Sequence, residues 1–198
     1  MKGFLVVLTI TLGLNASVSA QEHTNRPPKL PPSTSTPAPA PPADTTPNPN
    51  APAWAKFTSE EGRFSVFIPG TPKDQVQTTP SNIGPYTTHL FTLRNPRHVF
   101  LIGYVDYDPS FNFNPQAELD ANRDQFVKNL KATLVASRNV KVDGYSALEF
   151  TAVADERIFK ARVYIVGRRP YLIVLGSQKD VDDTFALNRF FSSFKITR

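Results

Sequence analysis

Two histidines and two aspartates come nearest to a catalytic or metal-binding set in this sequence. His89 and His98 lie on two neighbouring stretches that are predicted as strands, and Asp106 and Asp108 flank Tyr107 at the end of the second stretch. Two carboxylates at this spacing could bind a hard cation or act as an acid and base pair. An enzyme with a site assembled from His89, His98, Asp106 and Asp108 is therefore one hypothesis for this chain.

The other parts that such chemistry requires are missing from the sequence. Two histidines without a third ligand at a defined spacing do not make a metal site, and the aspartates lack the glycine and the further oxygen ligands of a calcium loop. The chain has no cysteine, which excludes thiol nucleophiles, disulfides and cysteine metal sites. Neither a G-x-S-x-G turn nor a glycine-rich phosphate-binding loop occurs. We therefore predict no catalytic residues, no metal site, no cofactor and no enzymatic activity.

Five other residues are candidates for a binding surface. Arg162 lies on a strand-like stretch, and Arg168 and Arg169 form a basic turn that could contact an anionic polymer or lipid headgroups. A solvated strand face with an exposed turn is the alternative interpretation of these arginines. Phe111 and Phe113 lie in a predicted loop, where they either pack beneath the following helix or form the rim of a pocket or of a protein-binding surface.

The three arginines belong to the strongest strand signal in the chain, from Arg157 to Gly176. Its first half alternates between apolar residues on one side and Lys160, Arg162 and Tyr164 on the other. Residues 171–175 are apolar at every position, which predicts a strand that is covered on both faces. A tight turn at residues 167–170 joins the two halves. We expect this hairpin to form the centre of a sheet.

The remaining segments predict a mostly antiparallel sheet with two helices. Asn114 and Pro115 are a helix-start signal, and apolar residues at helical spacing extend the predicted helix to about Leu134. A second, short helix is expected to begin at Asp180, with Phe185, Leu187, Phe190 and Phe191 buried. Further strands are predicted at 56–59, 63–68, 74–78, 86–93, 98–107, 138–142, 145–154 and 194–197. The fold class is therefore α+β, with the helices covering opposite faces of the sheet.

The N-terminal quarter of the chain differs from the rest in composition. Residues 1–20 have the apolar run and the small-residue end of a signal peptide, so we predict export with cleavage before Gln21. If the signal stays uncleaved, it would anchor the chain to a membrane. Residues 21–53 are rich in proline and are expected to form a disordered linker, which leaves a single globular domain over residues 54–198. The net charge of +5 is mixed in sign and predicts no nucleic-acid partner.

Several segments resemble the PsbP-like domain family of exported and lumenal proteins, over most of residues 57–196. The segments that carry the resemblance are the opening 62–66 strand that leads into Pro69, the long helix, residues 142–150, residues 167–175 and the closing residues 190–196. The chain departs from the family at residues 69–72, which read Pro-Gly-Thr-Pro. The resemblance implies an α-β-α sandwich and binding or assembly work in place of catalysis. We therefore expect an exported, tethered domain that binds a protein or another component of the cell envelope.

Overall fold

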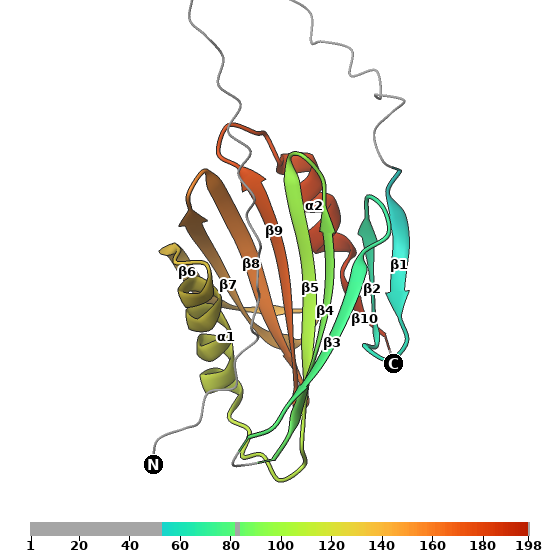
Figure 1. Ribbon diagram of the computed structural model, residues 1–198, viewed down its shortest axis with the longest axis vertical. Coiled ribbons are helices and arrows are strands. Elements are labelled where there is room, and N and C mark those ends of the chain that lie inside the picture. Colours follow the sequence, from blue (N-terminus) through green and yellow to red (C-terminus); the bar gives the residue numbers. More distant parts are fainter. Residues whose placement is uncertain (1–52, 82–83, 198) are drawn as a thin grey trace, which may run out of the picture. The chain divides into compact units, whose positions relative to one another are not determined.

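The computed structural model describes residues 53–81 and 84–197 of the 198-residue chain (Figure 1). The predicted signal peptide at 1–20, its cleavage site and all but the last residue of the predicted linker at 21–53 lie outside the described residues. The predicted globular domain is described almost in full. All strand pairs within it are antiparallel, so the domain is α+β as the sequence predicts.

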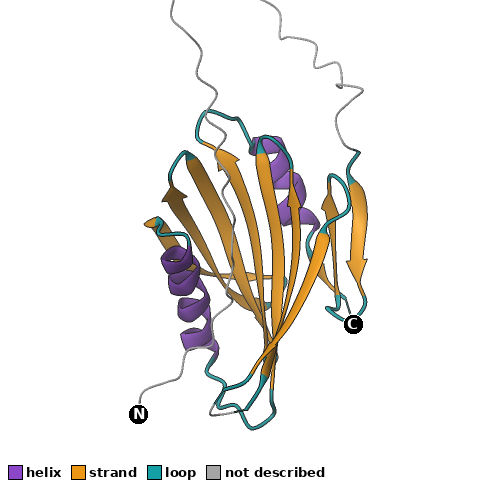
Figure 2. Ribbon diagram, viewed as in Figure 1, coloured by secondary structure: helices purple, strands orange, loops and turns teal. Residues whose placement is uncertain are grey.

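Most strands that follow one another along the chain pair as antiparallel hairpins, and two helices interrupt this order. They are β1 (Ala55–Ser59), β2 (Phe64–Ile68), β3 (Lys73–Thr79), β4 (Tyr86–Arg94), β5 (His98–Tyr107), α1 (Pro115–Asn129), β6 (Thr133–Val142), β7 (Tyr145–Ala154), β8 (Arg157–Val166), β9 (Arg169–Gln178), α2 (Thr184–Ser193) and β10 (Lys195–Ile196). The main sheet has seven strands in the order β3-β4-β5-β9-β8-β7-β6, and a second sheet has three in the order β1-β2-β10 (Figure 2).

The β8–β9 hairpin lies in the middle of the main sheet. β9 pairs with β8 on one side and with β5 on the other, and every residue from Pro170 to Ser177 is buried. A strand can be apolar at each position only when layers cover both of its faces. The prediction of a central hairpin with a doubly covered second strand is therefore confirmed.

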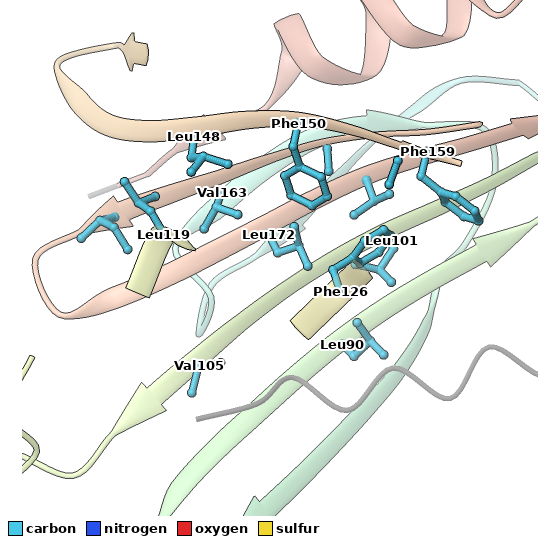
Figure 3. Close-up of a cluster of buried hydrophobic side chains, with 14 of the residues drawn as sticks. Leu90, Leu101, Val105, Leu119, Phe126, Leu148, Phe150, Phe159, Val163 and Leu172 are labelled. Carbon is cyan, nitrogen blue, oxygen red and sulfur yellow. The ribbon is translucent and has the colours of Figure 1, made fainter. Parts of the chain in front are cut away.

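One face of the main sheet packs against α1. Leu119 and Phe126 of the helix contact apolar side chains from the strands, which Figure 3 shows as one continuous cluster. The labelled strand residues in this cluster are Leu90, Leu101, Val105, Leu148, Phe150, Phe159, Val163 and Leu172. Phe126 meets Phe150 and Phe159 edge to face at ring-centroid distances of 5.5 and 5.7 Å, a geometry that aromatic pairs prefer.

The opposite face packs against α2 and the three-stranded sheet. Phe64 of β2, Phe190 of α2 and Phe194 contact Phe100, Tyr171 and other residues of the main sheet. β10 pairs with β2 and takes no place in the main sheet, which the sequence did not predict. The second covering layer therefore combines a helix with a small sheet, whereas the first consists of a helix and the loop that precedes it.

The first helix begins where the sequence predicts and ends earlier. The Asn114 side chain accepts a hydrogen bond from the Ala117 amide at 3.0 Å, and Pro115 is the first helical residue. The predicted extension to Leu134 is wrong, because Lys131 adopts a left-handed conformation with φ of 50° and Ala132 donates to the Val127 carbonyl at 2.9 Å. This is the Schellman arrangement that ends many helices. Leu134 then belongs to β6.

The second helix begins later than predicted and buries fewer residues. Its first residue is Thr184, because Asp180 lies in a preceding turn and the backbone amide of Thr184 is bonded to the Asp182 carboxylate at 3.0 Å. Phe190 is fully buried as expected, whereas Phe185 is 66% exposed. The expectation that Phe185 is a core residue is therefore wrong. Its ring lies at the edge of the Trp54 ring, 6.0 Å away between centroids.

A buried carboxyl group links α1 to the end of β5. The Tyr107 hydroxyl donates a 2.7 Å hydrogen bond to Glu118, which is a buried residue of the first helical turns. Burial raises the pKa of the Glu118 carboxyl above its usual value, and the hydrogen bond from Tyr107 offsets this only in part. The ionised form is therefore the less favourable one in the folded domain.

We expect Phe126→Ala and Phe185→Ala to have very different effects on stability. Phe126 is 2% exposed and its truncation leaves a cavity between α1 and the sheet, which costs about 3–5 kcal/mol of the free energy of unfolding. Phe185→Ala at an exposed position should cost less than about 1 kcal/mol. Urea denaturation of both variants measures the difference. Equal losses would contradict this assignment of core and surface.

We expect Glu118→Gln to change the pH dependence of stability. A raised pKa means that the folded state binds the proton more tightly than the unfolded chain. The stabilisation is complete below the unfolded pKa of about 4.3 and is lost as pH rises through the folded value. Glutamine keeps an acceptor for Tyr107 without a charge. The variant should therefore unfold at higher urea concentration than the wild type near pH 7, with the gain shrinking towards about pH 3.5. A loss of stability near pH 7 would contradict the prediction.

Candidate binding groove

The predicted histidine and aspartate set does not come together in the structure. His98 begins β5 and Asp106 lies eight residues further along it, which separates their backbones by about 26 Å in an extended strand. Asp108 is in the following turn, where its carboxylate accepts hydrogen bonds from the amide and hydroxyl of Ser110 at 2.9 and 2.6 Å. The hypothesis of one enzyme site made from these four residues is therefore wrong.

His89 and Asp106 alone are neighbours. The buried His89 Nε2 lies 3.8 Å from an Asp106 oxygen and 3.8 Å from a Glu61 oxygen, and its ring stacks on Tyr104 at 4.3 Å. Asp106 also forms a 2.6 Å ion pair with Arg169, so a guanidinium already occupies the position next to this carboxylate. Within residues 53–81 and 84–197, no group of three or more histidine, aspartate or glutamate side chains is arranged to hold a metal ion.

His98 lies apart from the other three residues, at the start of β5. Its Nε2 is buried and has no hydrogen-bond partner among the described residues. Burial lowers the pKa of its imidazole, which the nearby Asp183 only partly opposes. A neutral imidazole beside the Phe100 ring, 5.8 Å away between centroids, acts as part of the packing.

The two candidate phenylalanines of the loop pack inward. Phe111 is buried and its ring stacks on Tyr107 at 4.4 Å. Phe113 is partly buried against the same cluster that contacts α1. The interpretation that these residues pack beneath the helix is confirmed, and the alternative of an exposed rim is wrong for Phe111.

The basic turn is also engaged within the domain, on both faces of the sheet. Arg168 donates to the carbonyls of Pro109, at 3.3 Å, and Phe111, and its guanidinium lies over the Phe113 ring at 5.8 Å. Arg169 turns to the other face, where it pairs with Asp106 and donates to the Glu61 carbonyl at 2.8 Å. These two arginines therefore tie loops to the hairpin, and they do not form one basic patch with Arg162.

Of the predicted binding residues, Arg162 lines a groove on the main sheet. A groove of about 570 Å³ lies on the α2 face of the main sheet, between α2 and the strands β6, β7 and β8. Leu187 and Phe191 of α2 form its apolar side. Its charged lining residues are Arg138, Glu149, Lys160 and Arg162.

Glu149 holds the two arginines of the groove in place. One of its oxygens accepts from Arg162 Nε at 2.9 Å and the other from Arg138 Nε at 2.9 Å. Burial raises the pKa of the Glu149 carboxyl, but the hydrogen bonds from Arg162 and Arg138 outweigh it and the net pKa is lowered. Arg162 is fixed further by a 2.8 Å hydrogen bond to the Tyr164 hydroxyl and by the Phe191 ring, 5.3 Å away.

The other two cations of the groove are more accessible. The Arg138 side chain is 75% exposed, so its bond to Glu149 is open to water. Lys160 lies 3.5 Å from an oxygen of Asp183, whose other oxygen accepts from the Ser177 hydroxyl at 2.7 Å. The lining of the groove carries three cations and one carboxylate, so its net charge is positive. Asp183 is not part of the lining, and its ion pair with Lys160 reduces this charge.

Most of this groove was not predicted from the sequence, although part of its signal is present there. Lys160, Arg162 and Tyr164 were predicted to share one strand face. The Asp143–Gly144 turn fixes the register in which Arg138 faces Glu149, and the next hairpin places Glu149 opposite Arg162. Register alone therefore identifies the charged row. The place of α2 above it depends on packing and has no such local signal.

Comparisons with known proteins find a shared fold and no closer relationship. No family model and no curated protein matches the chain. The solution structure of cyanobacterial PsbP from Synechocystis sp. PCC 6803 is similar with a TM-score of 0.50 and 14% identity, over 73% of this chain and 93% of that one. At this identity the likeness shows a PsbP-like fold alone.

Two further solved structures are matched less well. A protein of unknown function and putative regulator from Pseudomonas aeruginosa has a TM-score of 0.34 at 12% identity, over 64% of this chain and 83% of that one. A protein from Bacteroides thetaiotaomicron has a TM-score of 0.32 at 16% identity, over 72% and 48%. These scores are too low to support an argument. Among the described residues, neither helix has the length and apolar character needed to span a bilayer.

We expect Glu149→Gln to destabilise the domain more than Arg138→Ala. Losing the Glu149 charge leaves the largely buried Arg162 without its ionic partner, which should cost about 1–3 kcal/mol of the free energy of unfolding. Arg138 is exposed, and its removal should cost less than about 1 kcal/mol. Because the Glu149 pKa is lowered in the folded state, its contribution is present above the unfolded pKa and is lost as pH falls through the folded one. Denaturation near pH 7 and about pH 3 checks both statements.

Proposed function

We propose that this chain is an exported, non-catalytic accessory protein whose domain binds a partner protein through the groove beside α2. The observation that carries the proposal is the lining of the groove, where three cationic side chains and one carboxylate surround an apolar side formed by α2. Such a lining suits a ligand that presents both carboxylates and apolar groups. An acidic stretch of polypeptide has this chemistry.

The absence of a catalytic set from the groove supports binding in place of chemistry. The hydroxyl-bearing residues of its lining are Ser137, Thr151 and Ser192, and no histidine is among the lining residues. The Ser137 hydroxyl is turned to the other face of the sheet, where it accepts from Arg123 of α1 at 3.2 Å. A hydroxyl nucleophile requires a base within hydrogen-bond reach. Glu149, the sole carboxylate of the lining, is already bonded to two arginines and has a lowered pKa, which makes it a poor proton acceptor.

Export and tethering rest on the sequence of residues 1–53. The signal-like segment would direct the chain out of the cytoplasm, and the proline-rich segment would act as a spacer between the domain and its point of attachment. A PsbP-like fold agrees with an accessory role outside the cytoplasm. The partner is accordingly a protein of the envelope or of the exported fraction.

We expect charge reversal in the groove to weaken the binding of an acidic peptide. The probe is a fluorescent peptide of about nine residues in which glutamate alternates with threonine or valine, added to the exported chain at low salt. Lys160→Glu should weaken binding about tenfold, which corresponds to about 1.4 kcal/mol. Lys128→Glu on α1 makes the same change of net charge on the other face of the sheet and should leave the affinity within about twofold.

Three outcomes would overturn the proposal. Equal weakening by Lys160→Glu and Lys128→Glu would mean that the peptide responds only to net charge. Tighter binding of dextran sulfate or anionic vesicles than of the peptide, with the same dependence on Lys160, would assign the groove to an anionic polymer or to lipid headgroups. Release of products from generic ester, phosphate or glycoside substrates, lost in Glu149→Gln, would show an enzyme.

A further inference from the structure

The strand β6 forms an edge of the main sheet, and no described strand pairs with its outer side. Its contacts with α1 are made by side chains on one face, where Ser137 accepts from Arg123 and Asn139 donates to Gln116. β6 pairs with β7 alone, and each of its residues from Thr133 to Asn139 is exposed. Figure 1 shows β6 at the outer side of the sheet, beyond β7. An exposed edge presents unpaired amide and carbonyl groups to any extended chain that approaches it.

The hairpin turn determines which backbone groups of β6 point outward. Asp143 and Gly144 have φ of 51° and 85°, as in the two-residue turn that closes a tight hairpin. Val142 and Tyr145 are then a hydrogen-bonded pair, and such pairs recur at every second residue. Val140 and Arg138 therefore bond to β7. The amides and carbonyls of Ser137, Asn139 and Lys141 are directed away from the sheet.

The charges of β6 select among the chains that could add to it. Its charged residues are Arg138 and Lys141, with no acidic residue in the strand. Two copies of β6 paired with each other would bring cations together, which disfavours self-association through this edge. The opposite edge, β3, is shorter, carries both Lys73 and Asp74 and is flanked by prolines. An acidic partner strand is thus complementary to β6 and not to β3.

The edge is continuous with the groove. Ala136 and Arg138 of β6 line the groove, and their side chains share its face of the sheet. Side chains alternate across a strand, so an added strand would direct every second residue towards this face, next to Arg138. At the other end of β6, the exposed Leu134 and Val135 offer apolar contacts. The register shift between Leu134 and Ala136 leaves the strand regular from Ala136 onward.

We propose that β6 is a docking edge at which an extended acidic segment of the partner protein adds as a further strand of the main sheet. Carboxylates at alternate positions of that segment lie on the groove face beside Arg138, and the charge of Lys160, two strands further into the sheet, adds to their attraction. The backbone of the segment bonds to Ser137, Asn139 and Lys141. Main-chain hydrogen bonds supply affinity in this mode and the alternate side chains supply specificity. The inference rests on the proposed function, because it specifies how the ligand of the same groove is held.

The test uses the alternating glutamate peptide and a version N-methylated at the amides that would face β6. N-methylation removes backbone donors and leaves every charge in place. We expect the methylated peptide to bind the exported chain at least about tenfold more weakly. Asn139→Pro removes one outward amide of β6, which an edge strand tolerates, and should weaken the unmodified peptide by a similar factor. Asn139→Ala loses the same side chain, keeps the amide and should bind like the wild type.

Hydrogen exchange gives a second readout that does not depend on a variant. The amides of Ser137, Asn139 and Lys141 should exchange faster than those of Arg138 and Val140 in the free chain, and should become protected when the peptide binds.

If Lys160→Glu weakens binding while the N-methylated peptide and Asn139→Pro bind normally, strand addition is wrong and the groove proposal stands. If Lys160→Glu has no effect, both are wrong. Dimerisation of the chain through β6, lost in Asn139→Pro, would assign the edge to a second copy and overturn the proposal.

Discussion

The need to cover β9 on both faces is the constraint on which the rest of the domain depends. The apolar run at residues 171–175 of β9 cannot face water on either side, so the sheet around it requires two separate layers. The helix α1 provides one layer over β7, β8 and β9. On the other side α2 is too short to complete the cover, and β2 with its neighbours fills the remaining area over β4 and β5. Two apolar clusters result, one on each face, and the strands of the hairpin contribute to both.

The groove is a consequence of this unequal second layer. On the α2 side, the apolar cluster includes Ala147 and Tyr164. It does not include the residues of β6, β7 and β8 that line the groove. Most of the side chains that these strands direct into the groove are polar or charged, since water has access to them. Glu149 then meets arginines from the strands on both sides, and the three side chains form a fixed charged row beside α2. Water reaches the groove face of β8, so polar and apolar residues alternate along this strand. It does not reach the central part of β9, which is apolar on both faces. The groove is therefore the part of the sheet that the second layer leaves uncovered.

The strands were predictable because their signal is local, whereas most of the site was not. Period-two alternation and turn dipeptides lie within a few residues of one another, so the hairpins and their register follow from short windows. The end of α1 was missed because Lys131, and not glycine, adopts the left-handed conformation there. The arginines were predicted to be free because their partners lie far away in the sequence. Arg168 reaches back to Phe111, and Arg169 reaches back to Glu61. No pattern in a window around residue 168 indicates either contact.

The pairing of β10 with β2 bears on how the domain is made in the cell. Phe64 and Ile196 are register partners although about 130 residues separate them along the chain. During synthesis, β2 therefore remains without this partner until a segment emerges long after it. Until then one face of the main sheet lacks part of its cover, and its aromatic side chains are open to other chains or to chaperones. Folding of this domain can accordingly be completed only after β10 has emerged.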